Sequence, residues 1–122
     1  MDASSTTNLR IPAQFGSNPA GVTANYETRV ELLKLAKKHD FIIIEDDPYY
    51  FIYYGDTPRA PSYFALEGRI LGEVGRVLRL DSFSKIMSSG LRLGWVTGPT
   101  YLVDALDRHV CRLTLVKSGQ RN

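Results

Sequence analysis

The chain has 122 residues, of which 43% are hydrophobic and 23% charged, a composition typical of one soluble globular domain. The formal net charge of +2 is small and the basic residues are scattered, so no nucleic-acid partner is expected. One cysteine excludes an internal disulfide, and no apolar run approaches the ~20 residues that span a bilayer. We therefore expect a cytoplasmic protein with no membrane partner.

The first part of the chain is polar and rich in turn-forming residues. Residues 1–10 are rich in Ser, Thr and Asn, which predicts a disordered N-terminus. Residues 11–15 allow a short strand, although Pro12 confines it to an edge or to the start of a strand. The tetrapeptide Asn18-Pro19-Ala20-Gly21 then predicts a turn, in which Asn18 has no role beyond turn formation unless other motifs give it one.

A helix is predicted next, capped by Thr23 or Asn25 and ending near His39. Its apolar positions recur at spacings of three and four and define a face to be buried; they are Tyr26, Val30, Leu33 and Ala36. The remaining positions are expected to face solvent, among them Glu27, Arg29, Glu31, Lys34, Lys37 and Lys38.

The run Phe41–Ile44 is continuously apolar, which is typical of a strand buried on both faces of a parallel sheet. A helix followed at once by such a strand is half of a βαβ unit and indicates the α/β class. Glu45, Asp46 and Asp47 follow at the carboxyl end of this strand, where open α/β sheets bind ligands. For Asp47 we favour simple capping of the strand in solvent. With no His or Cys nearby, no metal site is expected.

A second strand, Val77–Leu80, leads into Ser82, Ser84 and Lys85, and Arg92 lies seven positions beyond the lysine. An ammonium group at the end of a buried strand is costly unless it is paired or neutral. Hydroxyl groups and a guanidinium group together suit a phosphate. The combination suggests a lysine held near a phosphorylated carbonyl compound, as Schiff-base chemistry requires.

The chain continues with a short strand at 94–98 and a second amphipathic helix that begins at Pro99 and Thr100. The apolar side of that helix is formed by Leu102, Val103, Leu106, Val110 and Leu113. Residues 114–122 are predicted to be a C-terminal tail.

Three ordered stretches carry a family resemblance: SNPAGVT at 17–23, IIIEDDPYYF at 42–51 and SFSKIMSSGLRLGWVTGP at 82–99. They resemble fold-type I pyridoxal-phosphate aminotransferases of class I/II, in the branch that contains kynurenine, 2-aminoadipate and fungal aromatic aminotransferases. The similarity covers residues 11–113. It implies a partial large domain of α/β class, with a mostly parallel sheet flanked by helices and an antiparallel strand at 94–98.

The resemblance also implies a site for pyridoxal phosphate. In it, Lys85 forms a Schiff base with the cofactor and moves protons, and Asp46 pairs with the pyridine nitrogen. The other cofactor-binding residues that it implies are Asn18 and Tyr49 at the ring oxygen, and Ser82, Arg92 and, as a helper, Ser84 at the phosphate. The reactants would be a small amino acid, aromatic or aminoadipate-like, and a 2-oxo acid, and full-length members form homodimers.

Other hypotheses remain at this point. Ser82-Phe83-Ser84-Lys85 also fits the S-x-x-K motif of serine β-lactamases, but no S-D-N motif follows it. The chain could instead be a cofactor-sensing domain or a degenerate, non-catalytic piece of the fold. The family's glycine-rich phosphate loop, its ring-stacking aromatic residue and its substrate-binding arginine cannot be located in the 122 residues. We therefore expect a fragment that is inactive alone.

Overall fold

The computed structural model describes residues 8–11 and 21–118, and its strands form one sheet. In order across the sheet they are β1 (Asn8–Arg10), β2 (Phe41–Asp46), β3 (Val77–Ser82) and β4 (Gly94–Thr97). β1 pairs with β2, and β2 with β3, in parallel, whereas β3 and β4 are antiparallel. The predicted α/β class, the mostly parallel sheet and the antiparallel last strand are therefore confirmed.

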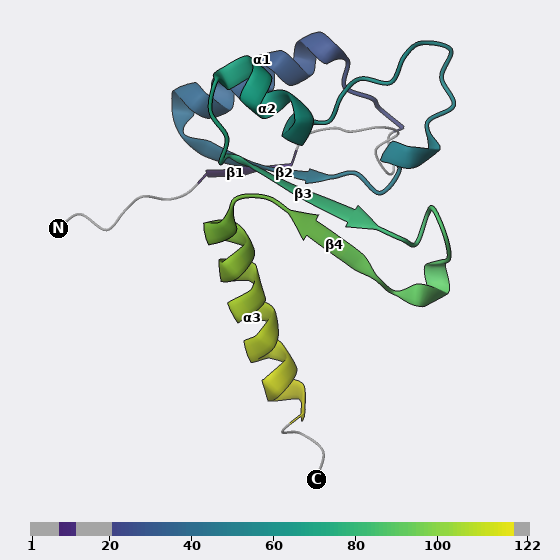
Figure 1. Cartoon of the computed structure of the whole chain (residues 1–122), viewed down its shortest axis with the longest axis vertical. Helices are drawn as coiled ribbons and strands as arrows, with labels where there is room; N and C mark the ends of the chain where they lie inside the picture. The colour runs from purple at the N-terminus through teal and green to yellow at the C-terminus, as the bar shows by residue number, and fades with distance from the viewer. Residues whose placement is uncertain (1–7, 12–20, 119–122) are drawn as a thin grey trace, which may run out of the picture.

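Two helices cover one face of this sheet and a third points away from it (Figure 1). The helices are α1 (Tyr26–His39), α2 (Tyr63–Leu71) and α3 (Thr100–Ser118), with short 3-10 turns at η1 (Tyr50–Ile52) and η2 (Ser89–Leu91). α1 connects β1 to β2 and α2 connects β2 to β3, as parallel neighbours require. No helix in the described part of the chain is long and apolar enough to cross a membrane.

The ends of α1 follow the sequence closely. The Asn25 side chain accepts a hydrogen bond from the Thr28 backbone N–H at 2.8 Å, so the predicted cap is confirmed. The buried face differs from the prediction, because Tyr26 is 45% exposed whereas Arg29 is fully buried. Arg29 was expected in solvent, but its guanidinium group lies 3.4 Å from a buried carboxylate of β2, which offsets its desolvation.

Helix α2 was not predicted from the sequence. Ser62 caps it by accepting a hydrogen bond from the Ala65 N–H at 3.1 Å, and Gly72 ends it with a φ of 69°. The left-handed conformation at this position favours glycine, which has no Cβ to clash. At nine residues, α2 is too short for a clear helical period to stand out from the aromatic and loop residues before it.

The two chain ends also depart from expectation. Residues 8–10, predicted to be disordered, form β1, with Asn8 opposite Phe41 and Arg10 opposite Ile43. The free edge of β2 provides the backbone partners that local composition does not reveal. α3 continues to Ser118, into the segment predicted to be a tail. The strand predicted at 11–15 and the turn at Asn18 lie outside the described residues, except for Ile11 and Gly21.

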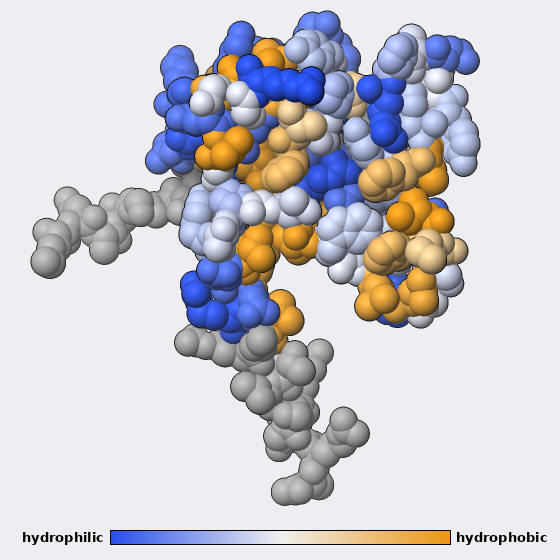
Figure 2. Space-filling model, in the orientation of Figure 1, coloured by the Kyte–Doolittle hydropathy of each residue, from blue (hydrophilic) through white to orange (hydrophobic). Residues whose placement is uncertain are grey.

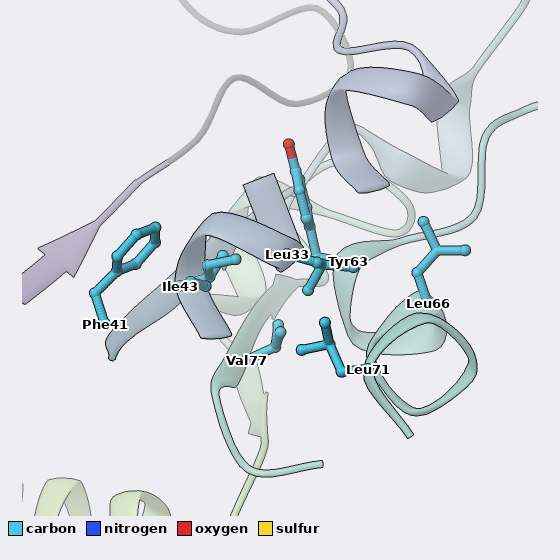
Figure 3. Close-up of a cluster of buried hydrophobic side chains, with 8 residues drawn as sticks. Leu33, Phe41, Ile43, Tyr63, Leu66, Leu71 and Val77 are labelled. Carbon is cyan, nitrogen blue, oxygen red and sulfur yellow. The ribbon is translucent and has the colours of Figure 1, made fainter. Parts of the chain in front are cut away.

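The hydrophobic core lies between the sheet and the two helices that cover it (Figure 3). Its buried members are Leu33 and Ala36 of α1, Phe41 and Ile43 of β2, Tyr63, Leu66 and Leu71 of α2, and Val77 of β3. On the opposite face of β2, Ile42 and Ile44 are only half-buried. The prediction of burial on both faces is therefore wrong for β2 in the described structure, because α1 and α2 both lie on one side.

A charged cluster extends the core toward the end of β2. Glu45 is fully buried and accepts hydrogen bonds from the backbone N–H groups of Tyr63 (2.9 Å) and Phe64 (3.1 Å) at the start of α2. A carboxylate is favoured there because the N–H groups of the first turn lack partners within the helix. Glu45 also forms ion pairs with Arg29 (3.4 Å) and Arg79 (3.5 Å). One side chain thus links α1, α2, β2 and β3.

We predict that Glu45→Ala lowers the free energy of unfolding by about 3–5 kcal/mol, because it leaves two buried guanidinium groups without their shared carboxylate. The control is Glu73→Ala, which removes an exposed partner of Lys37 and should cost about 0–1 kcal/mol. Urea unfolding followed by circular dichroism measures both. Equal and small losses in the two variants would contradict a structural role for Glu45.

Candidate functional site

The two sequence motifs at the ends of β2 and β3 meet at one edge of the sheet. These strands run parallel with Asp46 opposite Leu80, so their carboxyl ends lie side by side (Figure 1). The turn after β2 carries Tyr49, and the turn at 83–87 after β3 carries Lys85. This is the edge at which open α/β sheets bind ligands.

The contact between these turns joins Lys85 to Tyr49. The Lys85 Nζ atom lies 5.4 Å from the centroid of the Tyr49 ring, within the range of a cation–π interaction. Tyr49 is half-buried, whereas Lys85 is exposed. The burial expected for the lysine is not observed, because the turn carries it past the end of β3. Its amine is thus accessible and held near a phenol.

The residues expected at the phosphate lie at the end of β3 and in the loop that follows it. The Ser82 hydroxyl oxygen accepts a hydrogen bond from the Ser84 N–H at 3.1 Å, which leaves the hydroxyl proton of Ser82 available for donation. Arg92 is exposed and has a left-handed backbone with a φ of 51°. In the part of the chain that the structure describes, no hydrogen bond joins Arg92 to either serine. The three residues are thus near one another in sequence, but no hydrogen bond in the described structure fixes Arg92 relative to the two serines.

Asp46 and Asp47 lie in different environments. Asp46 is exposed at the site edge, whereas Asp47 is fully buried. Within the described structure neither carboxyl oxygen of Asp47 has a hydrogen-bond partner. Burial, reinforced by the neighbouring charge of Glu45, raises the pKa of Asp47 from 3.8 to about 6. The expectation that Asp47 caps the strand in solvent is therefore wrong. Asn18 lies outside the described residues.

The sequence did not predict the arginine contacts next to this edge of the sheet. Arg79 donates two hydrogen bonds of 2.8 Å to Asp81, and its guanidinium carbon lies 4.4 Å from the centroid of the Tyr50 ring. Arg59 lies 3.7 Å from the same centroid and donates to the Tyr50 carbonyl at 2.6 Å. Period-two alternation in β2 and β3 could have placed Glu45, Arg79 and Asp81 on the core face.

Comparison with known proteins identifies the family. A model of the family "Aminotransferase class I and II" matches residues 16–121. The chain belongs to the class I and II aminotransferases. It is 46% identical over 95 residues to the mitochondrial kynurenine/alpha-aminoadipate aminotransferase of Bos taurus, and 51% identical over 105 residues to the aminotransferase tdiD of Emericella nidulans. These alignments cover 78% and 85% of this chain but only 21% and 24% of the two relatives.

Solved aminotransferase structures share the fold. A kynurenine aminotransferase from Pyrococcus horikoshii, in complex with PMP, superposes with a TM-score of 0.74 at 37% identity. The alpha-aminoadipate aminotransferase LysN from Thermus thermophilus, complexed with N-(5'-phosphopyridoxyl)-L-leucine, gives a TM-score of 0.73 at 30% identity. The matches cover 83% and 81% of this chain and 24% and 25% of those chains. The fold described here is thus that of part of an aminotransferase.

The loop that carries Lys85 is closed at its base by close packing of β3 and β4. A Cβ atom at Gly94 would lie 2.7 Å from the Asp81 backbone oxygen, whereas one at Gly90 would meet nothing nearer than the Ser88 hydroxyl at 3.6 Å. We therefore predict that Gly94→Ala lowers the free energy of unfolding by about 1–3 kcal/mol through overpacking, and more than Gly90→Ala does. Urea unfolding of both variants tests this. A larger loss at Gly90 would show that the strand contact does not limit the loop.

Proposed function

We propose that this chain supplies the cofactor-attachment portion of an aminotransferase, which moves an amino group from an amino acid to a 2-oxo acid. The observation that carries the proposal is the position of the Lys85 amine beside Tyr49, at the sheet edge where Asp46 is also exposed. An amine, a phenol and a carboxylate there meet the needs of one ligand, pyridoxal phosphate.

The chemistry of the donor set fits this cofactor. Lys85 offers an accessible amine for a carbonyl carbon, and Asp46 an exposed carboxylate for a protonated pyridine nitrogen. The Ser82 hydroxyl can still donate a hydrogen bond, which suits a phosphate oxygen. Arg92 offers a guanidinium group for bidentate contact with the same phosphate, helped by Ser84. Tyr49 and, by family resemblance, Asn18 would bind the ring oxygen.

Bound pyridoxal phosphate supplies a carbonyl carbon and a ring that accepts the electron pair of a broken Cα–H bond. Lys85 would hold the cofactor through Nζ and, once displaced by the amino acid, would accept and release a proton at Nζ. Asp46 would pair with the protonated pyridine nitrogen of the cofactor. Tyr49 orients Lys85 through the face of its ring.

The substrate class follows from similarity. The relatives include kynurenine/alpha-aminoadipate aminotransferases and an aromatic amino acid aminotransferase of Schizosaccharomyces pombe, 38% identical over 117 residues. We propose an aromatic or aminoadipate-like amino acid as donor. A homodimer, as in full-length family members, and a cytoplasmic location stay predictions; the Bos taurus relative is named as mitochondrial.

We predict that pyridoxal phosphate attaches preferentially to Lys85. After incubation with the cofactor and reduction with borohydride, peptide mass spectrometry should find the label mainly on Lys85, and Lys85→Ala should abolish that signal. Lys34, exposed on α1, is the matched control, and Lys34→Ala should leave labelling of Lys85 unchanged. Uniform labelling of all exposed lysines would favour a degenerate chain that has lost the cofactor site.

The two adjacent aspartates should differ in their effect on this labelling. Asp46→Asn should lower cofactor attachment to Lys85 at neutral pH far more than Asp47→Asn, because only Asp46 is exposed at the site edge. The extent of borohydride-fixed label against cofactor concentration gives the comparison. Equal losses, or the reverse order, would disprove the assignment of Asp46.

These 122 residues by themselves are expected not to catalyse transamination. By family resemblance, the ring-stacking side chain and the substrate-binding arginine come from other parts of an aminotransferase, and loss of positioning costs many powers of ten in rate. The assay is transfer from an aromatic amino acid to 2-oxoglutarate by the purified chain with added cofactor. Turnover on the order of 1 per second would refute this expectation.

A further inference from the structure

The buried cluster behind the site contains more acids than bases. Two guanidinium groups, from Arg29 of α1 and Arg79 of β3, face three carboxyl groups: Glu45 of β2, Asp81 of β3 and Asp47 just after β2. Glu45 and Asp81 are each paired with an arginine, at nitrogen–oxygen distances of 2.8 to 3.5 Å. Asp47 is fully buried and neither of its carboxyl oxygens has a hydrogen-bond partner in the described structure. The charges in the cluster balance only when Asp47 carries a proton.

The backbone of Asp47 also connects the end of β2 to the turn that carries Tyr49; we call this connection the joint. Its N–H donates to the Leu80 carbonyl at 3.4 Å, and its carbonyl accepts from the Tyr50 N–H at 3.2 Å. Asp46 precedes this joint and Tyr49 lies in the turn that it closes. Because the buried Asp47 side chain holds this part of the backbone in place, an outward shift of that side chain would also move Asp46 and Tyr49.

We propose that Asp47 is a positioning residue for the lysine site: as a neutral acid it seats in the charged cluster and holds Asp46 and Tyr49 in place. The link to cofactor binding rests on the proposed function. The burial of the Asp47 side chain in the cluster and its backbone hydrogen bonds do not. When Asp47 ionises, three negative charges face two positive ones without added hydrogen bonds, and the joint loosens.

The direction of the pH effect follows from the raised pKa of Asp47, which burial shifts from 3.8 to about 6. Below pH 3.8 the folded and unfolded chains both hold the proton. Between pH 3.8 and about 6 the unfolded chain releases it first, so the contribution of Asp47 to stability falls as the pH rises, and it levels off above 6. Asp47→Asn is neutral at every pH. It should therefore gain stability relative to the natural chain across this window.

The test compares the natural chain with Asp47→Asn, and uses Asp56→Asn, in the exposed loop, as the control. Carboxyl carbon NMR should show one aspartate that titrates near pH 6 and is missing only in Asp47→Asn. The nuclear Overhauser contact between the Lys85 side chain and the Tyr49 ring should weaken as the pH rises through about 6 in the natural chain, and stay constant in Asp47→Asn. Borohydride-fixed label at Lys85 should be equal in the two proteins at pH 5 and greater in Asp47→Asn at pH 7.5.

An Asp47 carboxyl that titrates near its ordinary value would overturn the proposal. So would a Lys85–Tyr49 contact with the same pH dependence in the natural chain and in Asp47→Asn. If neither protein takes up pyridoxal phosphate at Lys85 at any pH, the proposed function fails, and the Lys85–Tyr49 contact still decides the role of Asp47. If both take it up with identical pH dependence, the cofactor site stands and the positioning role is wrong.

Discussion

The rest of the structure depends on the buried carboxylate of Glu45. It satisfies two N–H groups that α2 cannot satisfy internally, and it offsets the charge of two arginines that would otherwise be expensive to bury. The apolar core between α1, α2 and the sheet supplies the burial, but it does not fix where α2 begins. The Ser62 cap and the hydrogen bonds to Glu45 do, and the hydrogen bonds to Glu45 hold α2 on the same side of the sheet as α1.

The end of β2 carries both buried and exposed acids. Along β2, alternate side chains point to opposite faces, so Glu45 and Asp47 enter the interior while Asp46 remains in solvent. The interior acids belong to the buried charged cluster, and the exposed acid is the one for which we propose a ligand-binding role. Exposed apolar side chains gather on the adjoining loop between β3 and β4, namely Ile86, Met87, Leu91 and Leu93 (Figure 2).

The sequence was sufficient for features that depend on local pattern. The Asn25 cap and the strand predicted at Phe41–Ile44, which extends to Asp46 in the structure, follow from residue type and period. The choice of Tyr49, whose ring lies near Lys85, came from the family resemblance. The sequence was insufficient where a distant partner decides. Arg29 reads as a surface residue until Glu45 is placed opposite it, and Asp47 reads as a strand cap until its burial near the charges of Arg29 and Arg79 is known. Strand β1 exists because β2 has an edge to pair with, which the three residues Asn8, Leu9 and Arg10 do not reveal by themselves.

The antiparallel pairing of β3 and β4 has a consequence for how a ligand could enter. Residues 83–93 form the loop of a hairpin, closed by the Phe83 N–H to the Leu93 carbonyl (3.1 Å) and by the Phe83 and Trp95 rings, whose centroids are 4.7 Å apart. Beyond that clasp, the hydrogen bonds described for the loop join residues within 82–93, and the Lys85–Tyr49 contact links it to the turn after β2, so the loop can open and reclose while the sheet hydrogen bonds persist. Its amides should exchange with solvent independently of global unfolding, which makes the lysine segment a separate cooperative unit that can adapt to what it binds.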